Sequence, residues 1–269
     1  MANFINKMCG ATSTGIEKVL GSNYSATNKI NSILDNKYSI DFDGSGDYID
    51  ASTSADNMST NTGSACMWVK LDASSNNETF LDICTGTSAA DKISLFYSTS
   101  NAEIRARYKG DSTVAEAAES ISSSAFIALG WTHLAMTWDN GTDDEVKLYR
   151  NGSLIDTQAT LTHYATTPDR VHLGKGANAD SGYHDGHMDN FALWTSVLTA
   201  DEITAIYNVR NPDFTAAFTD TEGNTYDSQE DLIQWLRMLE NTGTSLADSS
   251  GNSNTATIVN ATWASDPAF

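Results

Sequence analysis

The stretch WTHLAMTWDNGTDDEVKLYRNGSLIDTQ, residues 131–158, decides the fold class. Its apolar residues Leu134, Met136 and Trp138 alternate with more polar neighbours, which is the pattern of a strand with one buried face. A polar turn and a second alternating run follow. Asn151-Gly152 then suits a two-residue type I′ turn, because both central positions of that turn need a positive φ. The stretch therefore predicts three antiparallel strands in a meander.

The same alternation recurs on the N-terminal side of this meander. Short apolar runs are separated by clusters of Gly, Asn, Asp and Ser, as antiparallel strands are separated by turns. None of the three prolines, at positions 168, 212 and 267, falls inside a run, which favours large continuous sheets. The runs cover residues 38–42, 48–49, 64–71, 79–84, 92–97 and 102–108.

The chain divides into three regions. Residues 1–37 are rich in Asn, Ser and Thr without a sustained period, and we interpret them as an N-terminal arm or docking segment. We expect a sandwich over residues 38–210, with one short helix near its end that begins at the Thr199–Glu202 capping box of TADEIT. Residues 211–269 form a C-terminal segment that we expect to complete the sandwich.

The charge of the chain excludes several classes of partner. Its 269 residues hold 35 acidic and 15 basic side chains, a formal charge of −20. Such acidity suits solubility, repels nucleic acid and anionic membranes, and attracts cations or basic partners. The three cysteines lack a CxxC spacing and indicate neither a zinc site nor a disulfide framework. Without a signal-peptide core or an apolar run of membrane-spanning length, we expect a protein that is made and kept in a cytoplasm, or that leaves it by lysis or as part of a particle.

Five segments in a fixed order carry a family resemblance. They are YSIDFDGSGDYID from residue 38, ACMWVKLDA from residue 65, the meander of WTHLAMTWDN and VKLYRNGSLI, VHLGKG from residue 171, and GHMDNFALWTSVLTADEITAIYN from residue 186. Together they resemble the laminin-G-like or concanavalin-A-like family over residues 38–208. The resemblance implies a two-sheet antiparallel jelly-roll sandwich whose concave sheet or rim loops bind carbohydrate or protein.

The C-terminal segment resembles a companion element of this family, WLRM followed by TSLADSSGNSNTATIVNATW. In many relatives this element precedes the FDG motif, whereas here it follows the helix, as a circular permutation would place it. This order is similar to domains of tailed-phage structural proteins. The apolar spacing of residues 228–240 fits either a helix or a strand, and the resemblance favours the strand.

The sequence does not indicate a catalytic centre. A family relative, the bacterial β-glucanase, carries an ExDxxE pattern, because a retaining glycosidase needs two carboxyls about 5 Å apart. This sequence has no such pattern. Asp143, Asp144 and Glu145 fall in a predicted turn, which indicates a solvated loop. We therefore expect a protein that is not an enzyme and has no catalytic residues.

The resemblance also implies one structural calcium between the FDG turn and an aspartate of a late strand. Asp43, Gly44 and Asp189 match these positions, with Asp47 nearby. Carboxylate and carbonyl oxygens are the ligands that calcium prefers. The alternative is that Asp189 is a buried carboxylate bonded to turn amides and Asp43 a turn-former.

Two further sets of residues suggest weaker sites. His184 and His187 have a spacing that suits zinc together with Asp189, although a loop leading into a strand is the commoner explanation. Tyr164 and Tyr183 lie near predicted loops, where an exposed ring can stack on a sugar, although single exposed aromatic side chains are ordinary.

These observations lead to one prediction with two alternatives. We predict a non-enzymatic structural, decoration or fibre-associated protein of a phage virion, made in the host cytoplasm and placed on the virion surface. Its expected partners are other virion proteins, further copies of itself, and glycans of the host or the environment, without nucleic acid or membrane insertion. The alternatives are a free, extracellular lectin-like carbohydrate-binding module and a glycoside hydrolase.

Overall fold

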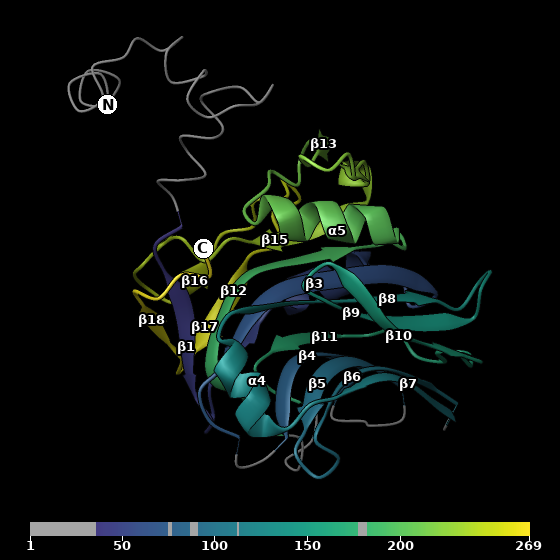
Figure 1. Cartoon of the computed structure of the whole chain (residues 1–269), viewed down its shortest axis with the longest axis horizontal. Coiled ribbons are helices and arrows are strands. Elements are labelled where there is room, and N and C mark those ends of the chain that lie inside the picture. The colour runs from purple at the N-terminus through teal and green to yellow at the C-terminus, as the bar shows by residue number, and fades with distance from the viewer. Residues whose placement is uncertain (1–35, 75–76, 87–90, 112, 177–181) are drawn as a thin grey trace, which may run out of the picture.

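The computed structural model describes residues 36–269 apart from 75–76, 87–90, 112 and 177–181. Only the last two residues of the predicted arm fall within this described part. Two antiparallel eight-stranded sheets stack face to face, which confirms the predicted all-β jelly-roll sandwich (Figure 1).

Sheet I has the order β10-β9-β8-β3-β12-β1-β18. Strand β15 pairs with the second half of β12, next to β1, which pairs with the first half. The strands of sheet I are β1 (Ser39–Asp43), β3 (Thr62–Leu71), β8 (Thr132–Asp139), β9 (Glu145–Arg150), β10 (Ser153–Ala159), β12 (Asp185–Trp194), β15 (Leu232–Leu236) and β18 (Thr262–Ala264).

Sheet II has the order β16-β17-β2-β11-β4-β5-β6-β7. Its strands are β2 (Tyr48–Asp50), β4 (Glu78–Cys84), β5 (Lys92–Ser98), β6 (Glu103–Gly110), β7 (Thr113–Ser120), β11 (Arg170–Leu173), β16 (Ser245–Leu246) and β17 (Ala256–Val259). The remaining elements are the hairpin of β13 (Phe218–Thr219) and β14 (Thr225–Tyr226), the helices α4 (Ser123–Leu129) and α5 (Ala200–Val209), and the short 3-10 helices η1 (Ser52–Asn57) and η2 (Gln229–Asp231).

The predicted meander is confirmed as β8-β9-β10 of sheet I. Asn151 and Gly152 have φ of 50° and 79°, as a type I′ turn requires. Leu134, Met136 and Trp138 are buried in the core between the two sheets. The alternation read from the sequence therefore gives the correct inward face.

Helix α5 lies across the outer side of sheet I, where it covers a second apolar cluster (Figure 1). Its capping box is confirmed: the Thr199 side chain accepts from the Glu202 backbone, and the Glu202 carboxylate accepts from the Thr199 backbone. Ile203 and Ile206 are buried beneath the helix against Trp194 and its neighbours. Helix α5 thus covers part of the outer side of sheet I.

The C-terminal segment contributes strands to both sheets. Strands β15 and β18 extend sheet I, and β16 and β17 extend sheet II. Within the segment whose state the apolar spacing left open, Leu232–Leu236 is a strand preceded by the 3-10 helix η2. Asp248 fixes the following turn, because its carboxylate accepts from the backbone N–H groups of Trp235 and Ser250.

An ion pair joins the two sheets at the β7–β10 edge of the sandwich. The Arg150 guanidinium donates two hydrogen bonds of 2.7 Å to the Glu119 carboxylate. The backbone N–H of Ala118 also donates to Asp156 over 2.9 Å. Both contacts link sheet II to sheet I. No helix in the described residues has the length and apolar character needed to cross a bilayer.

Candidate functional site

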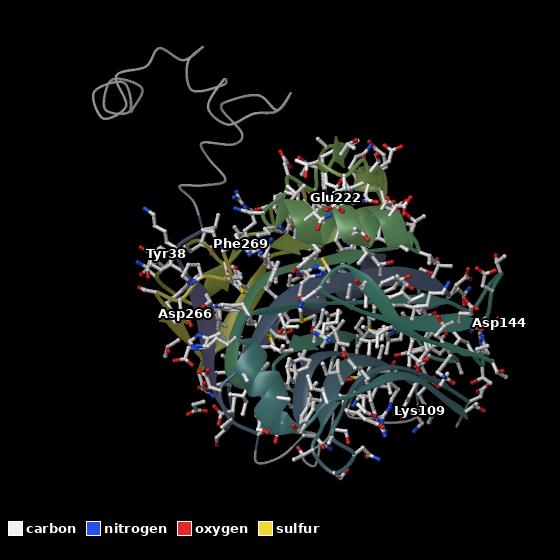
Figure 2. The ribbon with its side chains drawn as sticks, viewed as in Figure 1. Tyr38, Lys109, Asp144, Glu222, Asp266 and Phe269 are labelled. Atoms are coloured by element: carbon white, nitrogen blue, oxygen red, sulfur yellow. The ribbon has the colours of Figure 1, made fainter. Side chains whose placement is uncertain are left out.

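The outer face of sheet II is polar. In β6, Ile104, Ala106 and Tyr108 are buried in the core between the sheets. Because strand side chains alternate between faces, Arg105, Arg107 and Lys109 project from the opposite face. Lys109 lies on the side of the sandwich away from α5 (Figure 2). The outer face of sheet II is therefore a polar face that α5 leaves uncovered.

A continuous line of polar side chains crosses this face at right angles to the strands. Strand register places each residue of the line directly beside the next, from β2 through β11, β4, β5 and β6 to β7. Directly paired residues on one face have side chains within contact range. We call it the transverse row, and it consists of Asp50, His172, Asp82, Ser94, Arg107 and Glu116.

The middle of the transverse row is shielded and its two ends are open. Asp82 is 0 % exposed, whereas the Asp50 side chain is 44 % exposed and that of Arg107 is 28 % exposed. Two shielded groups lack a hydrogen-bond partner among the described residues, namely the Ser94 hydroxyl and Nδ1 of His172. Buried polar atoms in folded proteins are rarely left unpaired.

Two aromatic rings lie along the same side of the row, near its two ends. The ring of Tyr48 contacts that of His172 at a centroid distance of 5.2 Å, and the Lys175 ammonium lies 4.2 Å from the centre of the Tyr48 ring. Towards the other end, the Arg107 guanidinium lies 4.5 Å above the ring of Phe96. Burial lowers the pKa of His172, although Asp50 acts in the opposite direction.

Ion pairs hold the charged members of the face in place. Buried Asp82 accepts a 3.0 Å contact from the Lys92 ammonium. A single carboxylate, that of Glu116, receives both Arg105, at 2.7 Å, and Arg107, at 2.5 Å. These contacts fix the guanidinium planes, so the face has a defined arrangement of donors.

The two tyrosines predicted as sugar contacts lie in different surroundings. Tyr183 forms an antiparallel bridge with Lys175, and directly opposed residues project to the same side. Because Lys175 covers Tyr48, half-buried Tyr183 belongs to the rim of the outer face of sheet II. The prediction for Tyr164 is not supported: its ring is 3 % exposed and packs beside Tyr108, so neither ring face is open to a sugar.

The residues predicted to bind calcium do not converge. Asp43 pairs with Asp185 across β1 and β12, so Asp189 lies four register positions further along, about 13 Å away. Gly44 is the glycine of the FDG turn, and its backbone N–H donates to the His184 carbonyl. Asp43, Gly44 and Asp189 therefore cannot form one set of ligands, because calcium–oxygen distances are about 2.4 Å.

Asp189 instead has the surroundings of the alternative reading, a buried carboxylate that accepts from amides. It is 0 % exposed, and its Oδ2 accepts from Asn36 Nδ2 at 3.1 Å and from the Ala268 backbone N–H at 3.0 Å. Asp43 acts as a turn-former, because its Oδ1 accepts from the N–H of Ser45. Asp47 in turn accepts from the Asp43 N–H.

The predicted zinc pair is divided between the two sides of sheet I. His184 is buried against Phe42 and lies 3.5 Å from the Glu78 carboxylate. His187 lies on the outer side, with its Nε2 3.1 Å from Asp72. Within the described ranges, no three His, Cys, Asp or Glu side chains are grouped so as to hold a metal ion.

The acidic turn between β8 and β9 belongs to sheet I and lies outside the outer face of sheet II. Asp144 lies at the far end of this turn (Figure 2). It is exposed and has a positive φ of 52°. This placement is that of a solvated loop.

The sandwich, with one outer face covered by a helix and the other polar, has the architecture of a lectin-like domain. The chain belongs to the concanavalin A-like lectin/glucanase superfamily, whose family model matches residues 43–204. No protein of curated function matches the sequence.

Two solved structures illustrate the likeness of fold. A Bacteroides ovatus protein to which carbohydrate binding is ascribed has a TM-score of 0.55 at 13% identity, covering 86% of this chain and 60% of its own. The CBM40 module of a Ruminococcus gnavus IT-sialidase, bound to α2,6-sialyllactose, has a TM-score of 0.51 at 18% identity, covering 64% of this chain and 97% of its own. At these identities the likeness is one of fold.

Most of the transverse row escaped sequence reasoning. Asp50, His172 and Ser94 are single polar residues in separate strands, and only sheet register brings them together. One local signal was present: EIRARYKG in β6 places a basic residue at every second position, so Arg105 and Arg107 share a face.

Proposed function

We propose that the protein is a non-catalytic carbohydrate-binding module whose binding surface is the outer face of sheet II. The observation that carries this proposal is the transverse row, whose open members are the Asp50 side chain, 44 % exposed, and the Arg107 side chain, 28 % exposed. Sugar hydroxyls both donate and accept hydrogen bonds, so a glycan on this face can bond to the Asp50 carboxylate as acceptor and to the Arg107 guanidinium as donor.

The rings beside the row support the same function. An aromatic ring offers a flat apolar face to the C–H side of a sugar while its polar neighbours bind the hydroxyls. Tyr48 is half-buried and lies between His172 and Lys175, so an imidazole and an ammonium group both contact its ring. The R. gnavus module that shares this fold is itself bound to a sialylated sugar.

The carboxylates of the row support binding rather than hydrolysis. A glycosidase needs one carboxyl that gives a proton and a second that attacks the sugar or activates water. Asp82 is fully buried and held by Lys92, and Glu116 is held by two arginines. Asp50 is the third carboxylate of the row and the open one, and a single available carboxyl cannot fill both roles.

A glycan panel tests this proposal with a matched pair of variants. We expect the full chain to bind at least one polysaccharide or oligosaccharide, and Tyr48→Ala to weaken that binding about tenfold, the effect of losing one stacking ring. Trp131→Ala is the control, because Trp131 is also half-buried but belongs to the sheet I side, near His187. Loss of binding in Trp131→Ala alone would move the site to sheet I. No binding to any glycan would overturn the function.

We also propose that this module is carried by a tailed-phage particle. The support is the order of elements, in which the strands of the C-terminal segment follow α5, as in the phage structural domains that the sequence resembles. Mass spectrometry of purified particles is expected to detect the chain at a copy number comparable to that of the other structural proteins of the particle. Light scattering of the purified chain is expected to show self-association. A chain present in the lysate but absent from the particles would favour the free lectin-like alternative.

A further inference from the structure

We infer that the glycan bound by the outer face of sheet II is anionic, with carboxylate or sulfate groups. This inference rests on the proposed function and adds the chemical class of the ligand. It starts from the distribution of cations in a chain whose formal charge is −20. Six of the twelve Lys and Arg residues in the described part of the chain lie on this face or its rim, namely Lys92, Arg105, Arg107, Lys109, Arg170 and Lys175.

Three of these cations form a second line across the sheet, next to the transverse row. Arg170 pairs with Cys84, Cys84 with Lys92, and Lys92 with Lys109. Neighbouring strands lie about 4.8 Å apart, so this basic row spans about 14 Å from β11 to β6. Its register positions hold no carboxylate; the middle cation, Lys92, is buried and paired with Asp82 of the transverse row, so Arg170 and Lys109 at the two ends are the members that face a ligand. That length matches successive charged groups along an extended acidic polysaccharide rather than a single small anion.

The arginines of β6 continue the positive charge past the basic row, because Arg107 belongs to the transverse row and Arg105 lies on its far side. Glu116 is shared by Arg105 and Arg107, so one negative charge faces two positive ones. Arg107 bonds to Glu116 through Nε and Nη2, which leaves its Nη1 for a ligand. A guanidinium held flat by Phe96 is suited to the paired hydrogen bonds that a carboxylate or sulfate accepts.

The balance of charge on the face differs from that of the whole molecule. Of the 35 acidic residues, the strands of this face present Asp50, Asp82, Glu103 and Glu116, with Asp169 at the edge, 3.8 Å from Arg170. Cations and carboxylates are therefore nearly balanced in number on this face, whereas acidic residues exceed basic ones by more than two to one overall. An anion is thus repelled less by this face than by the molecule as a whole, which orients it on approach.

The test compares polygalacturonate, dextran sulfate and neutral dextran as ligands for the full chain. We expect both charged polymers to bind, dextran to bind at least tenfold more weakly, and the affinity for the charged polymers to fall as salt is raised. Polygalacturonate and dextran sulfate separate carboxylate from sulfate recognition. The double variant Arg170→Gln/Lys109→Gln should lower the affinity for the preferred polymer about tenfold.

Two controls distinguish a lost ligand contact from a lost fold or a general charge effect. Lys147→Gln/Arg210→Gln removes the same charge at sites outside the outer face of sheet II and should leave affinity unchanged. Arg170→Lys keeps the charge and should retain most of the affinity of the parent chain. Melting curves of each variant, compared with that of the parent, show whether it is folded.

The outcomes separate this inference from the function on which it rests. Equal binding of neutral and charged polymers, insensitive to salt and to Arg170→Gln/Lys109→Gln, would overturn the anionic ligand while leaving glycan binding intact. Equal losses in the sheet II variant and in the control pair would show a general charge effect and would also overturn it. Failure to bind any sugar overturns both.

Discussion

The side-chain amide of Asn36 donates a 3.1 Å hydrogen bond to the buried carboxylate of Asp189, 153 residues later in the chain. The same oxygen accepts from the backbone N–H of Ala268. One carboxylate in the middle of sheet I therefore holds both the first and nearly the last described residue. Two side-chain oxygens, Oδ1 of Asp189 and Oδ1 of the Asn36 amide, have no hydrogen-bond partner among the described residues.

Asp189 makes the stability of the fold depend on pH. Burial raises the pKa of its carboxyl from 3.8 to about 7, against hydrogen bonds from Ala268 and Asn36 and the charge of Arg237 that lower it. The folded protein therefore keeps a proton that the unfolded chain releases above about pH 4. The stabilising contribution of this group is complete below about pH 4 and is lost as the pH rises through about 7.

The variant Asp189→Asn cannot ionise and isolates this effect. Relative to the parent chain, we expect its free energy of unfolding to rise between about pH 4 and about pH 8, by up to about 4 kcal/mol. Urea unfolding across this range measures the difference. Asp144→Asn, in the exposed turn, should give none. Parallel curves for Asp189→Asn and the parent would show that Asp189 ionises equally in the folded and unfolded chains.

The ion pair between Arg150 and Glu119 should stabilise the sandwich measurably, because it joins the two sheets and is bidentate. Both side chains are partly exposed, so solvent screening limits the loss in Arg150→Gln to about 1–2 kcal/mol in urea unfolding. A double-mutant cycle with Glu119→Gln gives the coupling directly. Lys147→Gln, which breaks the pair with Glu145 within one sheet, should cost less than about 0.5 kcal/mol. A coupling near zero would show that the edge is closed by backbone contacts alone.

Gly63 leaves room for a buried indole. A Cβ at this position would lie 2.2 Å from the ring of Trp138, which is 0 % exposed. Gly63→Ala should therefore destabilise the protein by about 1–3 kcal/mol through overpacking. In Gly141→Ala the nearest atom to the new Cβ is 3.5 Å away, and the melting temperature should hardly change. Equal melting temperatures for the two variants would mean that the indole shifts without cost.

The distance between Asp43 and Asp189 makes a prediction for calcium. One ion cannot bind both residues, so Asp189→Asn should show the same response of melting temperature to calcium and to chelator as the parent chain. Differential scanning calorimetry with added calcium and with chelator measures this response. A response that disappears in both Asp43→Asn and Asp189→Asn would show a shared site and a different arrangement of β1 and β12.

Local sequence signals predicted the fold because they act within a few residues. The Asn151-Gly152 turn and the Thr199–Glu202 capping box depend only on adjacent backbone, and both are present as expected. The strand at Leu232–Leu236 needed the family resemblance, because its apolar spacing alone also fits a helix. Element type was thus accessible wherever the signal is local.

The candidate site was less accessible because it depends on register between distant strands. Asp50 and Ser94 come together only through β11 and β4, and nothing in either strand encodes that pairing. Tyr164 was predicted to be exposed because its neighbouring residues resemble a loop, but its ring packs in the core. The alternating basic residues in β6, and Tyr183 at the rim, were the parts of the site that the sequence could indicate.

The C-terminal segment determines when the two sheets can be completed during synthesis. Strand β1 pairs with β18 and β2 with β17, so strands made among the first fifty residues wait for partners made about two hundred residues later. A chain emerging from the ribosome therefore carries unpaired strand edges in both sheets until residues 256–264 have been made, which is the state most prone to aggregate. Folding of this sandwich is necessarily a late, long-range event, and a chain released early would lack the strands that cover these edges.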